Sequence, residues 1–111
     1  MYEPGDVVVT VFPGADQTKR RPAVVLSTAR YNAKRPDIML GVITSQLHTA
    51  RTEFDCALHD WKQAGLHQPS AFRSFVITIP ARAIIARIGK LSENDWHSVQ
   101  SCAAKALATH D

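Results

Sequence analysis

Short apolar segments separated by glycine and proline are the feature that most limits how this chain can fold. They are residues 7–12 (VVVTVF), 23–27 (AVVLS), 37–44 (DIMLGVIT), 54–58 (FDCAL), 74–79 (SFVITI) and 83–89 (AIIARIG). Segments of this length, rich in β-branched residues, are typical of strands. Because they do not alternate with helices, a doubly wound parallel sheet is excluded, and the pattern predicts an antiparallel sheet.

Two glycines are expected to shape this sheet. Segment 37–44 is continuously apolar, which indicates burial on both faces, and Gly41 within it predicts a bulge or a sharp bend. Residues 59–66 (HDWKQAGL) are expected to make one helical turn that ends at Gly65. A bend of this kind suits the strongly curved sheet of a small closed barrel.

The carboxyl-terminal segment has the pattern of one amphipathic helix. Ser92 is placed to cap its first turn, and Asp95 is expected to reach back to it, close to a capping box. Leu91 and Trp96 have the spacing of a hydrophobic staple. Apolar residues recur every three to four positions, at Trp96, Val99, Ala103, Ala106 and Leu107. This stripe predicts a helix that lies against the sheet.

One domain, residues 1–111, is expected to contain all of these elements. A chain of 111 residues with 45% hydrophobic residues can bury a single core. No internal repeat, low-complexity segment or interdomain linker is present. The predicted fold is therefore mainly β, a small antiparallel barrel with short helical turns and one C-terminal helix.

Several broad classes of function find no support in the sequence. No apolar run approaches the roughly 18 residues of a membrane span, and no signal-peptide pattern opens the chain, so a cytoplasmic protein is expected. Cys56 and Cys102 are expected to be buried thiols in a reducing compartment. The five histidines show no ligand spacing and no cofactor motif is present, so neither a metal nor a cofactor is expected.

Positive charge is concentrated in the first half of the chain. Residues 1–51 hold seven Lys and Arg against four Asp and Glu, whereas residues 52–111 hold six of each. Three of these cations, Lys19, Arg20 and Arg21, are consecutive. The asymmetry indicates an anionic partner, although scattered surface charge would explain it almost as well.

Polar residues at the ends of two strands suggest a phosphate site. Arg21 begins one expected strand and Thr44 ends the next, so antiparallel pairing would bring both to one rim. Arginine offers a permanently charged fork to phosphodiester oxygens, and the hydroxyl adds a hydrogen bond. RNA carries its own nucleophile, the 2′-hydroxyl, so such a site needs no metal in principle. On composition alone, a solvated arginine and an ordinary strand threonine explain these residues better.

Five segments occur in order along the chain: GDVVVTVF (5–12), QTKRRPAVVLS (17–27), GVITSQ (41–46), DWKQAGLHQPS (60–70) and ARIGKLSENDW (86–96). Together they resemble the MazF/PemK/Kid family of toxin–antitoxin ribonucleases over nearly the whole length. The resemblance implies an SH3-like barrel, a homodimer, and metal-independent cleavage of single-stranded RNA that leaves a 2′,3′-cyclic phosphate and a 5′-hydroxyl. It also implies a separate antitoxin protein, whose partly disordered acidic tail blocks the RNA groove.

The resemblance assigns roles residue by residue. The family's Arg-Pro arginine maps onto Arg21 and its Thr-Ser threonine onto Thr44, which implies that both are catalytic. Arg21 would stabilise the developing phosphorane charge and Thr44 would hold the scissile phosphate, while the general base is unassigned. RNA contacts are expected from Lys19, Arg20, Gln17, Ser45 and Gln46.

Some positions depart from the family pattern. The loop at 13–19 (PGADQTK) is shorter than in many members, so no cut-site preference carries over. Arg73 lies near the place of an arginine proposed as the acid in the Kid branch, but its aspartate partner is missing, so Arg73 is assigned to RNA binding and a catalytic role is left open. Trp61 and Phe72 either stack on unpaired bases or fill a core or dimer contact, and the second reading is favoured.

Two alternatives to a ribonuclease remain. CcdB-like gyrase inhibitors share the barrel, and their activity resides at the carboxyl terminus, although KALATHD (105–111) has no close likeness to theirs. An inactive relative that binds RNA or a partner without cutting would also keep the fold.

Overall fold

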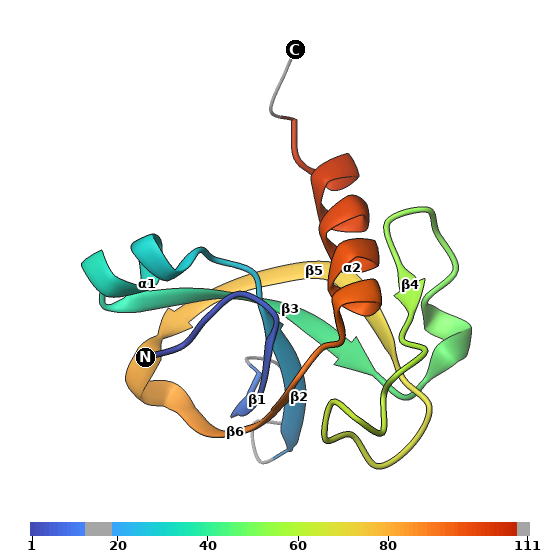
Figure 1. Cartoon of the computed structure of the whole chain (residues 1–111), viewed down its shortest axis with the longest axis horizontal. Coiled ribbons are helices and arrows are strands. Elements are labelled where there is room, and N and C mark those ends of the chain that lie inside the picture. Colours follow the sequence, from blue (N-terminus) through green and yellow to red (C-terminus); the bar gives the residue numbers. More distant parts are fainter. Residues whose placement is uncertain (13–18, 109–111) are drawn as a thin grey trace.

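The computed structural model describes residues 1–12 and 19–108 of the chain (Figure 1). Its elements are β1 (Asp6–Val11), β2 (Arg20–Val25), α1 (Ala29–Lys34), β3 (Asp37–Thr44), η1 (Leu47–Thr49), β4 (Cys56–Ala57), β5 (Ala71–Pro80), η2 (Ala81–Ala83), β6 (Ile84–Lys90) and α2 (Glu93–Ala106). The strands form one antiparallel sheet in the order β4-β5-β3-β2-β1-β6. No helix in the described ranges is long and apolar enough to cross a bilayer.

The predicted class, mainly β and antiparallel with a C-terminal helix, is confirmed. Strand β3 has the predicted bounds, whereas β2 and β5 each begin three residues earlier than expected. These extra residues pair with neighbouring strands, a tertiary effect that local composition does not reveal. Strands β4 and β6 are the edges of the sheet, and within the described residues no pairing between them closes it into a barrel.

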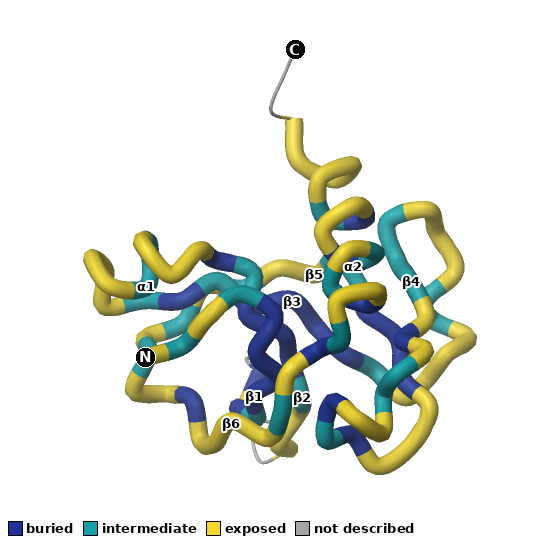
Figure 2. Tube along the Cα trace, viewed as in Figure 1, coloured by how far each residue is buried: buried dark blue, intermediate teal, exposed yellow. Residues whose placement is uncertain are grey.

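Both faces of the central strands are buried, as Figure 2 shows by the dark tube of β1, β2 and β3. Val7 and Ile43 belong to one apolar cluster, which α2 and the loop after β4 cover. Val8 and Leu40 belong to a second cluster on the opposite face. The prediction that segment 37–44 is buried on both faces is therefore confirmed.

Gly41 marks an irregularity in the sheet, as predicted. The register between β3 and β5 shifts between Gly41 and Val42. A Cβ atom on Gly41 would clash with the ring of Phe72, which is fully buried beneath it. Phe72 is therefore a core residue, which excludes base stacking by its ring, and Trp61 is half-buried against the same cluster.

Helix α2 begins as predicted, but its capping box does not form. The Ser92 Oγ atom accepts a hydrogen bond of 3.2 Å from the Asp95 N–H. The Asp95 carboxylate does not reach back to Ser92; it accepts the backbone N–H groups of His59 at 3.0 Å and Asp60 at 2.8 Å. Asp95 is 1% exposed, so these bonds satisfy a buried carboxylate and tie the loop to the helix.

The apolar stripe of α2 ends earlier than its spacing predicts. Leu91 and Val99 are buried, and Trp96 packs against their cluster. Cys102, which the stripe omitted, is buried as well. Leu107 is exposed, because the last turns of α2 extend beyond the sheet (Figures 1 and 2).

The loop between β4 and β5 makes the predicted turn at Gly65. The Leu66 N–H donates to the Trp61 carbonyl and the Gly65 N–H to the Lys62 carbonyl, both at 3.1 Å. This pair of bonds is the Schellman pattern that ends helical turns. Gly65 has a φ of 90°, a left-handed conformation that favours glycine.

Candidate functional site

The pairing of β2 with β3 ends at Pro22. The paired residues are Ala23 with Val42, Val24 with Gly41, and Val25 with Leu40. Proline has no N–H to donate to a neighbouring strand. A cavity of about 380 Å³ lies beyond this point, lined by residues of both strands. The Arg-Pro sequence thus coincides with the opening of the site.

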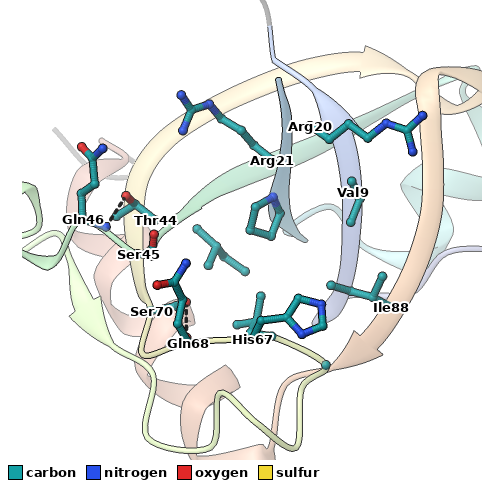
Figure 3. A pocket seen from close by; sticks show the side chains of 14 residues that line it. Val9, Arg20, Arg21, Thr44, Ser45, Gln46, His67, Gln68, Ser70 and Ile88 are labelled. Carbon is teal, nitrogen blue, oxygen red and sulfur yellow. Dashed lines mark hydrogen bonds between the residues drawn. The ribbon is translucent and has the colours of Figure 1, made fainter. Parts of the chain in front are cut away.

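Arg21 and Thr44 both line this cavity. Continuing the β2–β3 register two residues beyond Ala23 and Val42 sets Arg21 opposite Thr44. In Figure 3 the guanidinium of Arg21 points toward the side on which Thr44 lies. The expectation that strand pairing brings these two residues to one rim is confirmed.

The hydroxyl of Thr44 is oriented by the turn that follows β3. Its Oγ1 atom accepts a hydrogen bond of 3.0 Å from the Gln46 N–H. Because this bond uses the oxygen as an acceptor, the hydroxyl proton can still be donated to a ligand. Ser45 and Gln46 are exposed and line the same cavity.

The remaining predicted residues lie in different places. Arg20 is exposed and lines the cavity, whereas Lys19 is exposed but does not line it. Gln17 lies outside the described residues. Arg73 is half-buried on β5 and lines a second cavity of about 470 Å³, together with Asp55. The structure therefore separates Arg73 from the Arg21–Thr44 rim.

A third wall of the rim cavity was missed by sequence reasoning. His67, Gln68 and Ser70 follow the Gly65 turn and line the cavity opposite the arginines (Figure 3). The Ser70 Oγ atom donates to the Gln68 carbonyl at 2.8 Å. The polar sequence HQPS (67–70) could have indicated a binding loop. Its place at the cavity could not be predicted, because it depends on how the loop packs against β6.

Cys102 on α2 and Cys56 on β4 face each other in the core, and neither lines the rim cavity. Cys102 is buried, as predicted, and Cys56 is half-buried. Burial, followed by the neighbouring thiol of Cys102, raises the pKa of Cys56 to about 12. Across residues 1–12 and 19–108, no group of three or more His, Cys, Asp or Glu side chains is arranged to hold a metal ion.

Comparisons with known proteins agree on one family and one fold. The sequence model of a family described as "PemK-like, MazF-like toxin of type II toxin-antitoxin system" matches residues 3–107. No curated protein sequence matches the chain significantly.

Three solved structures illustrate the similarity in fold. Mycobacterium tuberculosis toxin MazF-mt6 is 18% identical, with a TM-score of 0.75 over 91% of this chain and 94% of that chain. An endoribonuclease in complex with its cognate antitoxin, from a mycobacterial species, is 13% identical, with a TM-score of 0.79 over 100% and 99%. MazF from Deinococcus radiodurans is 22% identical, with a TM-score of 0.74 over 97% of each chain. At these identities the likeness is one of fold.

Proposed function

The chain belongs to the PemK-like, MazF-like toxins of type II toxin–antitoxin systems, and from this premise we propose that it is an endoribonuclease toxin. It cleaves single-stranded RNA, such as mRNA, in the cytoplasm and requires neither a metal nor a cofactor. The observation that carries the proposal is the meeting of Arg20, Arg21 and Thr44 around one cavity. The similar fold of a protein described as an endoribonuclease supports it.

The proposed chemistry uses the nucleophile that RNA itself supplies. The 2′-hydroxyl oxygen bonds to the adjacent phosphorus as the bond to the 5′-oxygen breaks, leaving a 2′,3′-cyclic phosphate and a 5′-hydroxyl. Arg21 stabilises the charge that grows on the phosphoryl oxygens, because its guanidinium offers two parallel donors. Thr44 donates its hydroxyl proton to a non-bridging oxygen and holds the scissile phosphate in place. Ser45, Gln46 and Arg20 contact the flanking nucleotides.

The outer residues of the proposed RNA path steer the substrate by charge. Lys19 is exposed beside Arg20 at the start of β2, where both can attract the phosphate backbone. Gln17, which lies outside the described residues, and Arg73, which lines a separate cavity, are proposed as further RNA contacts away from the rim.

Neutralisation by an antitoxin follows from the same positive rim. We expect a small protein whose acidic, partly disordered tail lies across Arg20 and Arg21 and excludes RNA. One of the similar structures is described as an endoribonuclease in complex with its cognate antitoxin. Competition between RNA and an acidic antitoxin peptide for the purified toxin would test this part of the proposal.

A homodimer is proposed as the active form, with residues 1–111 as one domain in each copy. Phe75 and Val76 on β5 are 55% and 44% exposed, and Leu107 after α2 is 62% exposed. An apolar hollow of about 530 Å³ lies between β5 and α2. A second copy that covers these side chains would remove apolar surface from water. Sedimentation of the parent and of Phe75→Glu measures this association.

The test of the proposed function is cleavage of a panel of single-stranded RNAs in EDTA, followed by mapping of both ends. We expect cuts that leave a 2′,3′-cyclic phosphate, and no cut where a 2′-deoxynucleotide replaces the residue before the cleaved bond. Binding of the RNA panel without any cut would favour the inactive relative. Toxicity that persists without RNA cleavage, and is lost on deletion of residues 105–111, would favour a gyrase inhibitor.

A further inference from the structure

The rim cavity contains a proton acceptor that the proposed roles do not use. Of the described residues that line it, those with ionisable side chains are Arg20, Arg21 and His67. Arginine stays protonated at every pH that proteins tolerate, so it does not serve as a base. Imidazole is the one of these groups that changes protonation between about pH 5 and 8.

His67 is an exposed side chain on a firmly held loop. Gly65 and Gly89 lie so close that a Cβ on either would clash with a carbonyl oxygen of the other segment, Ile88 or Ala64. At the other end of the loop the Leu58 N–H donates to the Ser70 carbonyl at 3.0 Å. The backbone that carries His67 is therefore held on both sides, which keeps this residue at the cavity wall.

His67 and the arginines lie on opposite walls of the cavity (Figure 3). In transfer at phosphorus, the attacking and leaving oxygens lie roughly in line on opposite sides of the phosphorus atom. A phosphodiester held between the walls can present its 2′-hydroxyl to the imidazole. Its leaving 5′-oxygen then lies toward the arginines, whose guanidinium groups can also donate to the adjacent phosphoryl oxygens.

We propose, as a deepening of the proposed RNA cleavage, that His67 is the general base of the reaction. Its imidazole takes the 2′-hydroxyl proton as the bond from the 2′-oxygen to phosphorus forms. The bond from phosphorus to the 5′-oxygen breaks, and that oxygen takes a proton from water. The imidazolium then returns its proton to the resulting hydroxide, so no net proton is gained or lost.

Few other charged side chains line the cavity around His67. The charged side chains that face it across the cavity are Arg20 and Arg21 of β2. The described lining residues of β1, β3 and β6 are uncharged, as are Gln68 and Ser70 on its own loop. Among the described lining residues, His67 is therefore the side chain that can act as a base in a pH–rate profile.

The experiment is single-turnover cleavage of RNA by the full chain, its His67→Ala and His67→Gln variants, and a His97→Ala control. His97 is an exposed histidine on α2 that does not line the cavity. We expect both His67 variants to lose about 10²–10⁴-fold in rate and the control to match the parent. The parent rate should fall toward acidic pH as a base becomes protonated, and this acidic limb should vanish in His67→Ala. Added free imidazole should restore part of the rate of His67→Ala.

Binding of a 2′-deoxy oligonucleotide distinguishes a general-base role of His67 from a role in RNA binding alone. We expect its Kd to differ by less than about threefold between parent and His67→Ala, since the base acts on the 2′-proton. A Kd increase as large as the rate loss, an unchanged acidic limb, or cleavage by His67→Ala at the parent rate would each overturn the assignment. A parent that cuts no RNA refutes the proposed function itself, and the assignment with it.

Discussion

The rim cavity and the buried network at the start of α2 use similar polar groups in opposite ways. At the start of α2, Asp95 accepts two backbone N–H groups, and the Ser92 hydroxyl donates to the Asp60 carboxylate at 2.6 Å. At the rim, Arg20 and Arg21 are exposed, and in the described residues neither forms an ion pair with an acidic side chain. The polar groups of the buried network are bonded to one another, whereas Arg20 and Arg21 at the rim are exposed and line an open cavity.

This difference predicts which substitutions should affect the stability of the fold and which should affect activity. A buried acceptor that is removed leaves its donors unsatisfied, which costs folding free energy. An exposed arginine that is removed leaves the fold almost unchanged but, in the proposed function, deletes a donor to the substrate. Substitutions in the buried network at the start of α2 should therefore lower the free energy of unfolding, and substitutions at the rim should change the rate of RNA cleavage.

The largest expected effect is the low reactivity of the Cys56 thiol toward alkylating reagents. Cys56 lies beside the buried network. Burial, then Cys102 and Asp95, raises the pKa of this thiol to about 12. At pH 8 its thiolate fraction is then about 10³-fold below that of an ordinary cysteine. We expect iodoacetamide to alkylate Cys56 more slowly than it alkylates glutathione, and the rate to rise with pH as the thiolate fraction rises. Mass spectrometry of the folded and urea-unfolded chain measures it, and rapid modification of Cys56 in the folded chain would contradict it.

The next effect is the loss of stability in Asp95→Ala. Two buried N–H groups lose their acceptor, so the free energy of unfolding should fall by about 2–5 kcal/mol. Glu93→Ala is the matched control, because Glu93 is an exposed acidic residue in the same first turn of α2. Urea denaturation followed by circular dichroism measures both. An equal free energy of unfolding in the two variants would contradict the claim that the buried network stabilises the fold.

A smaller effect is expected at Thr44. Thr44→Val removes a hydrogen bond to a charged phosphate, worth about 1.5–3 kcal/mol, so cleavage should slow by about 10- to 100-fold. Thr44→Ser keeps the hydroxyl and should recover most of this rate. Single-turnover kinetics distinguishes the pair, and equal rates for valine and serine would exclude a role for the hydroxyl.

The smallest effect concerns charge steering at the start of β2. Lys19→Ala and Arg20→Ala should each lower the slope of log Kd against log salt concentration by about 0.7, as expected for one phosphate contact on a single strand. Arg82→Ala, which removes an exposed cation outside the cavity, should leave the slope unchanged. Salt titrations with a 2′-deoxy oligonucleotide provide the slopes, and parallel lines for parent and both rim variants would exclude steering by these residues.

Local sequence patterns predicted the strands well because β-branched runs and Pro-Gly punctuation are local signals. The bounds of β3 and the cap at Ser92 followed directly from them. The hydrogen-bond partners of the Asp95 carboxylate could not be predicted in this way. His59 and Asp60 are more than 30 residues away from Asp95 and contact it only in the folded chain.

The same contrast holds within the site. Arg21 and Thr44 were predictable because antiparallel neighbours place the start of one strand beside the end of the next. His67 was not, because it reaches the cavity through close glycine contacts between the loop and β6. Arg73 was expected on the RNA path, yet it lines a different cavity, since its place depends on the irregular β3–β5 register.

The most direct test of RNA cleavage at the rim is the rate of Arg21→Ala against that of Arg82→Ala in EDTA. We expect a loss of about 10²–10³-fold for Arg21→Ala, a smaller loss for Arg21→Lys, which keeps the charge without the fork, and none for Arg82→Ala. The free energy of unfolding should stay within about 0.5 kcal/mol of the parent in all three variants. Cleavage by Arg21→Ala at the parent rate would contradict a catalytic role for the rim.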